Sequence, residues 1–205
     1  MSEEKICTAE QLYCFVKTKL SRKRFIHSVG VAQTAEMLLE RYRCENYVKN
    51  WELFTAGAFC GLAHDLGREM SDDDIVLFCK NHGLELSGEQ IQAPVIAHGT
   101  VSAYMAGEIC GFYPESWAKA IRVHTTGCEG MDDLALALFI ADYIEPSRTF
   151  FDDTARQLYL DSPSIEDCAY RVLCDMIEHW EKKGYHKAGT DTLAMKEDIE
   201  KRLGR

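Results

Sequence analysis

The stretch Leu134-Ala-Leu-Ala-Leu-Phe-Ile-Ala141 decides the fold class that this sequence predicts. Eight consecutive apolar residues leave no polar face, so a helix formed by them must be surrounded by other helices. The alternation of apolar and polar residues that marks a half-buried strand is almost absent, and only four prolines interrupt the chain. The sequence therefore predicts an all-α helical bundle with this stretch at its centre.

Helix start and stop signals are frequent along the whole chain. Thr8-x-x-Gln11 and Ser87-x-x-Gln90 have the form of capping boxes, in which side chains and backbone bond reciprocally at a helix start. Further N-caps are expected at Asn50, Ser71 and Ser164, an N1 proline at Pro114, and helix stops at Gly83, Gly111, Gly127 and Gly184. The expected helices span 9–20, 22–44, 51–65, 72–81, 88–98, 100–110, 114–125, 131–145, 152–160, 165–183 and 190–203.

Length and charge limit the domain organisation and the partners. The 205 residues fit one domain, and we expect residues 151–205 to form a C-terminal helical extension packed on a core of residues 1–150. The final helix has only a thin apolar stripe and is expected to dock peripherally or to fray. A net charge of −10 argues against binding to nucleic acid or to an anionic membrane, which requires Lys and Arg patches. A small anionic substrate remains compatible with this charge.

Cysteine usage and the absence of targeting signals indicate a cytoplasmic protein. The nine cysteines are scattered and form no C-x-x-C pair, so we expect reduced thiols that pack as small apolar groups. The polar N-terminus has no signal-peptide pattern, and the longest uncharged stretch, 90–107, contains Pro94 and Gly99. No membrane-spanning segment is expected.

Four histidines and two aspartates have a setting that favours a metal site. The residues three, four and seven positions after His27, and before each of His64, His98, His124 and Asp142, are apolar or small, which predicts inward side chains. A lone inward histidine is more often a hydrogen-bonded core residue than a ligand. An ionised carboxylate after a wholly apolar run is costly, however, unless it is paired or coordinates a metal. Together with Asp65, these residues form a candidate set of six ligands.

The ligand types narrow the metal and the chemistry. Imidazole and carboxylate ligands without thiolates suit Fe, Mn, Co, Ni or Zn. Six ligands exceed what one tetrahedral ion takes, and a carboxylate can bridge two ions. His64, His98 and His124 each precede a glycine closely, so three helix C-termini are expected to face the site. Two divalent ions would clamp a phosphoryl group and activate a bridging water, which favours hydrolysis of a phosphate ester or anhydride.

Candidate phosphate-binding residues lie close to these ligands in the sequence: Arg24, Arg68, Arg148, Thr125 and Thr126. Each arginine alone is equally well explained by an exposed or salt-bridged role, but their shared position beside ligands favours phosphate binding. Three aromatic residues could contact a base or belong to the core: Tyr104, Tyr143 and Phe150. The remaining histidines, His82, His179 and His186, lack an inward setting and are expected to be structural or exposed.

The chain resembles the HD-domain metal-dependent phosphohydrolases. Their pattern H…HD…D appears as His27, His64-Asp65 and Asp142, with the two further histidines of the binuclear branch at His98 and His124. Finer matches resemble the YqeK-type symmetrical bis(5'-nucleosyl)-tetraphosphatases within this family. The segments that carry this resemblance are 24–32, 61–65, 97–99, 120–127 and 131–148.

The resemblance implies an HD-domain helical bundle with a di-iron centre held by the six ligands, Asp65 bridging. It also implies that His64, Asp65 and Arg68 are catalytic and that a metal-bridging hydroxide splits diadenosine tetraphosphate into two ADP. Such proteins often have lysine at the position of Arg68, and a guanidinium is a poor proton donor. The alternatives are hydrolysis of a nucleoside monophosphate or guanosine alarmone, or a non-catalytic metal- or nucleotide-binding regulator. Whether the helices after residue 150 cap the site or form a homodimer stays open.

Overall fold

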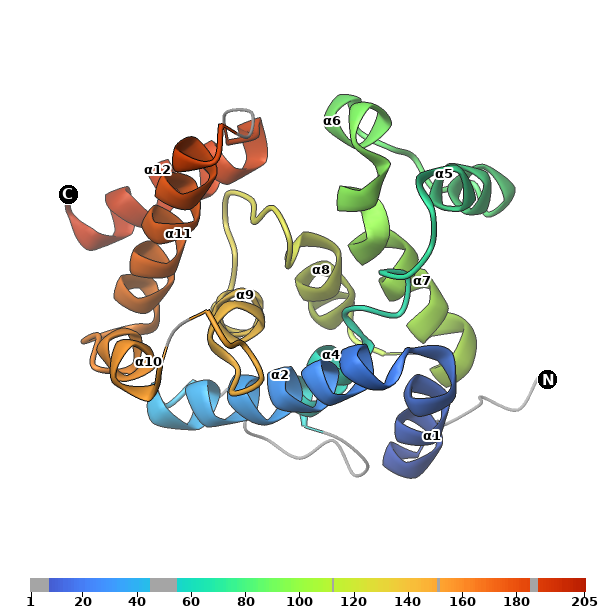
Figure 1. The fold of residues 1–205 in the computed structure, drawn as a ribbon, viewed down its shortest axis with the longest axis horizontal. Coiled ribbons are helices and arrows are strands. Elements are labelled where there is room, and N and C mark those ends of the chain that lie inside the picture. The colour runs from blue at the N-terminus through green and yellow to red at the C-terminus, as the bar shows by residue number, and fades with distance from the viewer. Residues whose placement is uncertain (1–7, 45–54, 112, 151, 185–187) are drawn as a thin grey trace.

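A computed structural model describes residues 8–44, 55–111, 113–150, 152–184 and 188–205. These ranges contain eleven α-helices, one 3-10 helix and no strand, which confirms the all-α prediction (Figure 1). The elements are α1 (Ala9–Lys19), α2 (Arg22–Arg41), α4 (Ala56–Ala63), α5 (Asp72–Asn81), α6 (Gly88–Gln92), η1 (Pro94–Ala97), α7 (His98–Cys110), α8 (Glu115–Val123), α9 (Asp133–Ile144), α10 (Asp153–Leu160), α11 (Ile165–Lys182) and α12 (Thr190–Leu203).

Local signals account for most helix ends. Both predicted capping boxes are formed, and the hydroxyls of Ser71 and Ser164 each accept a hydrogen bond from the backbone N–H three residues later. The four glycines predicted as stops all have positive φ. Pro114 is the N-cap of α8 instead of its first residue. The predicted cap at Asn50 lies outside the described residues, and Thr55 caps α4.

The prediction of one continuous helix over 88–98 is wrong, and the difference changes where the candidate ligand His98 lies in its helix. Helix α6 ends at Gln92, because Pro94 has no N–H to donate and its ring opposes continuation of the helix. The chain then forms the short η1, and His98 starts α7 instead of ending a helix. Gly99 is therefore not a stop, and only α4 and α8 end at candidate ligands, His64 and His124.

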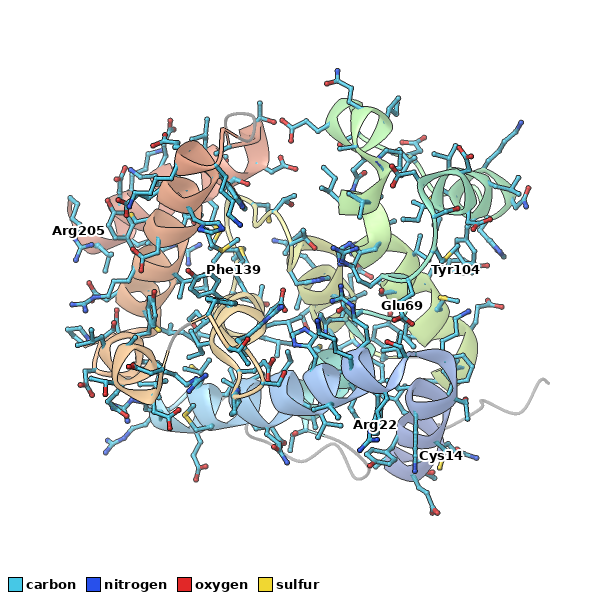
Figure 2. All side chains as sticks on the ribbon, viewed as in Figure 1. Cys14, Arg22, Glu69, Tyr104, Phe139 and Arg205 are labelled. Carbon is cyan, nitrogen blue, oxygen red and sulfur yellow. The ribbon has the colours of Figure 1, made fainter. Side chains whose placement is uncertain are left out.

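Helix α9 lies at the centre of the molecule, as its apolar sequence predicts. Every residue from Leu134 to Ala141 is buried, including Phe139, which is labelled in Figure 2. Helices α2, α4, α8 and α11 pack around it, and Figure 1 shows α9 between α8 and α11. Because α9 is enclosed, the polar residues at its C-terminal end are held at the meeting point of several helices.

Two glycines allow the helices that carry the candidate ligands to approach closely. A Cβ on Gly61 of α4 would lie 2.3 Å from the Cα of Ala32 on α2. A Cβ on Gly99 of α7 would lie 2.7 Å from the backbone oxygen of Ile121 on α8. Neither contact leaves space for a methyl group, so these glycines bring α2 to α4 and α7 to α8 within backbone contact.

The C-terminal helices pack against the rest of the bundle. Helix α11 contacts α9, and α12 contacts α11, where Met195 and Ile199 are buried. Thr192 at the start of α12 donates a hydrogen bond to the backbone oxygen of Thr126 over 2.8 Å. The thin apolar stripe thus docks α12 peripherally, one of the two expected outcomes. No described helix is long and apolar enough to cross a membrane.

Candidate metal centre

Four histidine side chains meet where α2, α4, α7 and α8 come together. Each ring is held through its Nδ1, and three of the rings donate to a backbone carbonyl oxygen of the same local turn: His64 to Gly61 (2.7 Å), His98 to Val95 (2.6 Å) and His124 to Ile121 (2.7 Å). A carbonyl only accepts, so Nδ1 carries the proton and Nε2 presents its lone pair. These three Nε2 atoms point into the centre of the cluster.

Asp65 lies between two pairs of these histidines. Its Oδ2 is 3.7 Å from His27 Nε2 and 3.6 Å from His64 Nε2. Its Oδ1 is 3.3 Å from His98 Nε2 and 3.9 Å from His124 Nε2. We call these the His27 end (His27, His64, Asp142 and Asp65 Oδ2) and the His98 end (His98, His124 and Asp65 Oδ1). One carboxylate therefore reaches both ends.

Asp142, after the buried run of α9, completes the His27 end. Its Oδ1 lies 3.0 Å from His27 Nε2 and 3.9 Å from His64 Nε2. The Asp142 side chain is partly exposed. The apolar run offers no cation to pair with it, but a cation later in the chain does. Arg148 contacts its Oδ1 and also donates from Nε to its backbone oxygen over 2.8 Å.

The donor set fits divalent transition metal ions. His64 Nε2 is buried and makes no hydrogen bond within the described part of the chain. The Nε2 atoms of His98 and His124 lie 3.1 Å apart, although each has its proton on Nδ1. Facing lone pairs of this kind are unfavourable unless an electron-pair acceptor lies between or beside them. Imidazole nitrogens combined with carboxylate oxygens suit such an ion.

The protonation of His64, His124 and Asp142 is compatible with metal binding. Burial lowers the pKa of His64, and burial together with its neighbours His98 and His64 lowers the pKa of His124 to about 3. Burial acts to raise the pKa of Asp142, but its hydrogen bond with His27 and nearby positive groups outweigh burial and hold the pKa below its usual range. Neutral imidazoles and ionised carboxylates are the forms that bind metals.

Glu145, which the sequence reasoning missed, holds the fourth histidine. It is fully buried, and its Oε1 accepts a hydrogen bond from His27 Nδ1 over 2.9 Å. Its Oε2 accepts from the backbone N–H of Ser147 over 2.6 Å. Burial acts to raise the pKa of Glu145, but the hydrogen bonds from His27 and Ser147 outweigh burial and lower the pKa. The sequence signal was a lone glutamate at the end of an apolar helix.

The structure brings two of the three candidate arginines to the cluster. Arg24 Nη1 donates to Asp65 Oδ2 over 3.0 Å, and Arg148 contacts Asp142. Arg68 follows in the turn after Asp65, where its backbone N–H donates to the backbone oxygen of Asp65 over 2.9 Å. Among the described residues its half-buried side chain makes no hydrogen bond or ion pair, so Arg68 contacts the candidate ligand Asp65 through its backbone alone.

The two candidate threonines are separated by the structure. The Thr125 hydroxyl lies 3.3 Å from His98 Nε2 and 3.2 Å from His124 Nε2, at the His98 end. The Thr126 hydroxyl donates to the backbone oxygen of Gly127 instead, and its own backbone oxygen accepts from α12. Thr126 therefore supports the loop and not the cluster.

A cavity of about 350 Å³ adjoins the His27 end. Its lining includes three cationic side chains, Lys23, Arg24 and Arg148, besides His27. Lys23 was not a sequence candidate. Phe150 also lines the cavity, and 59% of its surface is exposed, whereas the other two aromatic candidates do not line it. Glu69, labelled in Figure 2, lies at the same cavity and accepts from the backbone N–H of Ser21.

The chain is similar to known proteins over most of its length. The HD domain family model matches residues 24–147. A Bacillus subtilis protein named symmetrical bis(5'-nucleosyl)-tetraphosphatase is 32% identical over 147 residues, which cover 69% of this chain and 70% of that protein. A Staphylococcus aureus protein of the same name is 32% identical over 158 residues, 76% of each chain.

The fold is also similar to a crystal structure from Clostridium acetobutylicum. That protein is described as a predicted HD superfamily hydrolase involved in NAD metabolism. The two structures superpose with a TM-score of 0.82 at 25% sequence identity, covering 96% of this chain and 99% of the other. The similarity extends past residue 147 and so includes the C-terminal helices.

Proposed function

Because this chain belongs to the HD-domain family and is a phosphohydrolase related to the symmetrical bis(5'-nucleosyl)-tetraphosphatases, we propose that it hydrolyses diadenosine tetraphosphate to two ADP. The observation that carries this proposal is the position of Asp65. Its carboxylate lies between two pairs of histidines, beside a cavity lined by three cationic side chains. Such a site combines two cation positions with a binding region for a polyphosphate.

The residues of the cluster divide between two cations. His27, His64, Asp142 and Asp65 Oδ2 would hold one, and His98, His124 and Asp65 Oδ1 would hold the other. Iron is the proposed metal, with Mn, Co, Ni and Zn as alternatives of similar ligand preference. When bound, two such cations would supply Lewis acidity, offsetting phosphate charge and making a water molecule a better nucleophile.

Arg24, Arg148 and Lys23 bind the phosphate chain in this proposal. A guanidinium can donate two parallel hydrogen bonds to phosphate oxygens, and an ammonium acts as a point charge. The side chains of Arg24 and Arg148 are each 31% exposed, so both can turn from their carboxylate partners toward the adjoining cavity. The negative charge of a tetraphosphate is thereby met locally, although the whole chain has a charge of −10.

Other residues orient the substrate. The Thr125 hydroxyl at the His98 end can donate a hydrogen bond to a phosphate oxygen. The exposed ring of Phe150 at the cavity offers a face on which an adenine base can stack. A catalytic role for Arg68 stays a prediction, since among the described residues its side chain contacts no candidate ligand.

The test is product analysis with the full chain loaded with Fe²⁺. Diadenosine tetraphosphate, a nucleoside monophosphate, a guanosine alarmone and NAD are each incubated in ¹⁸O-labelled water, and the products are separated by anion exchange. We expect two ADP, one carrying the label on its terminal phosphate. His64→Ala should abolish turnover, whereas His82→Ala, outside the cluster, should not.

Three outcomes would overturn this proposal. ATP plus AMP would show asymmetric cleavage. Turnover of only the monophosphate or the alarmone would favour the other hydrolases. Bound metal without turnover of any nucleotide would favour a regulator.

A further inference from the structure

Glu145 differs from every other group that holds a histidine ring in this cluster. The Nδ1 atoms of His64, His98 and His124 donate to backbone carbonyls, whereas His27 Nδ1 donates to a carboxylate 2.9 Å away. This carboxylate is fully buried at the end of α9. A buried carboxylate needs partners to offset its loss of hydration, so its placement beside a single imidazole requires an explanation.

The surroundings of Glu145 are built to hold its carboxylate in one position. Ser147 donates to it from both its backbone N–H and its hydroxyl. On the facing helix, a Cβ at Gly30 would lie only 2.4 Å from Glu145 Oε2, so the glycine three residues after His27 leaves the space that the carboxylate occupies. The nearest guanidinium nitrogen, Arg148 Nε, is 3.9 Å away. The His27 ring is therefore the candidate metal ligand whose properties the Glu145 carboxylate can change.

We infer that Glu145 is a positioning residue for His27, which strengthens cation binding at the His27 end by fixing the orientation of the ring and making its Nε2 more basic. A carboxylate partner on Nδ1 holds the ring with Nε2 facing Asp65 and Asp142. It also withdraws the Nδ1 proton partially, which increases electron density at Nε2. At the other three histidines, the backbone carbonyls also fix the orientation of the ring. A neutral carbonyl withdraws the Nδ1 proton less than a carboxylate does, so it raises the basicity of Nε2 less. This inference rests on the proposed cation site.

The experiment is a double-mutant cycle on cation affinity, not on activity. Metal-free full-length protein is titrated with Co²⁺, with binding followed by calorimetry and by the visible absorption of the bound ion. Glu145→Gln keeps a hydrogen-bond acceptor without the charge, and Glu145→Ala removes both. Each is made alone and in the His27→Ala background. Glu89→Gln is the matched control, because Glu89 is a half-buried carboxylate outside the cluster that contacts Thr190 on α12.

The expected result is a specific loss of affinity. Glu145→Gln should weaken the tightest Co²⁺ binding by about tenfold, and Glu145→Ala by more, within the range typical of groups that support a metal ligand. Neither change should alter affinity in the His27→Ala background, and Glu89→Gln should leave affinity unchanged. The visible absorption of the bound Co²⁺ should shift in Glu145→Gln, because the His27 ligand becomes a weaker donor.

Two results would overturn the inference. An undiminished affinity in Glu145→Gln and Glu145→Ala would show that Glu145 does not act on the site. An equal loss in the presence and in the absence of His27 would show a structural role. Hydrolysis of diadenosine tetraphosphate is measured on the same samples. Wild-type protein that binds Co²⁺ but hydrolyses no nucleotide would contradict the proposed function without contradicting the role of Glu145.

Discussion

Asp65 Oδ1 lies 3.3 Å from His98 Nε2, on the opposite side of the carboxylate from the oxygen that faces His27. The ends of the site therefore share one residue. If both oxygens bind cations, Asp65→Asn should reduce the metal content from two ions per chain to one or fewer. Turnover should fall by at least about 100-fold, the upper range for loss of a group that merely supports a ligand. Elemental analysis and initial rates would measure both, and two retained ions would contradict this expectation.

Substitution of His98 should empty one end of the site only. His98→Ala removes a ligand of the His98 end, so we expect one ion per chain to remain, held at the His27 end. The matched control is His82→Ala, since His82 is hydrogen-bonded to the Tyr104 hydroxyl and lies outside the cluster. That variant should keep two ions. Equal metal content in the two variants would argue against two separable ends.

The cavity beside the His27 end should control substrate affinity. Arg148→Ala should lower kcat/KM for diadenosine tetraphosphate by roughly 10–100-fold, the expected loss of a hydrogen bond to a charged group. Phe150→Ala should raise KM by about tenfold if an adenine stacks on the ring, with little change in kcat. Steady-state kinetics distinguish the two effects. An unchanged KM in Phe150→Ala would place the base elsewhere.

Close helix approach at Gly61 should make this position intolerant of a side chain. Gly61→Ala would place a methyl group 2.3 Å from the Ala32 backbone, so α4 must shift away from α2. We expect a loss of about 1–3 kcal/mol in the free energy of unfolding. Gly88→Ala is the control, because nothing lies within 4 Å of that position in α6. Chemical denaturation should show Gly88→Ala unchanged or slightly more stable.

Tyr42 at the end of α2 hydrogen-bonds to the end of α10 and the loop after it, and its ionisation should make the free energy of unfolding depend on pH above pH 10. Burial, reinforced by the nearby Cys168, raises the pKa of Tyr42 to about 12, and its hydroxyl donates to the backbone oxygens of Leu160 and Ser162. In the unfolded chain this group ionises near pH 10, so the unfolded state loses a proton that the folded state retains. Its contribution to stability is therefore complete below pH 10 and lost as pH rises toward 12.

Tyr42→Phe isolates this contribution. Between pH 9 and pH 11 the wild type should lose about 1 kcal/mol more stability than the variant. Urea unfolding at the two pH values measures the difference. Parallel losses in the two proteins would show that Tyr42 does not link its ionisation to folding.

Much of the fold follows from local sequence because the signals are local. Capping hydroxyls, left-handed glycines and a proline act within a few residues, and the eight apolar residues of α9 have no solvent-compatible face. The break at Pro94 shows the limit of this reasoning. Apolar spacing continues across 88–98, but the missing N–H ends α6 and places His98 at the start of α7.

The candidate ligands could be selected from the sequence because each lies on an inward helical face, and the structure does bring all six together. Their grouping into a His27 end and a His98 end could not be predicted. That grouping depends on how α2 approaches α4 and α7 approaches α8, which Gly61 and Gly99 permit. Residues at helix ends and in loops were the least predictable. Thr125 and Thr126 are adjacent, yet only the first faces the cluster.

The sequence by itself determined the all-α class, the central position of α9 and the six inward polar residues, since helical periodicity and burial cost are properties of short segments. Only the tertiary structure decided that Glu145 holds His27, that Arg148 meets Asp142, and that Lys23 and Phe150 line a shared cavity with Arg24. These pairs are separated along the chain or lie in loops. Their contacts depend on the relative placement of packed helices, which no local pattern specifies.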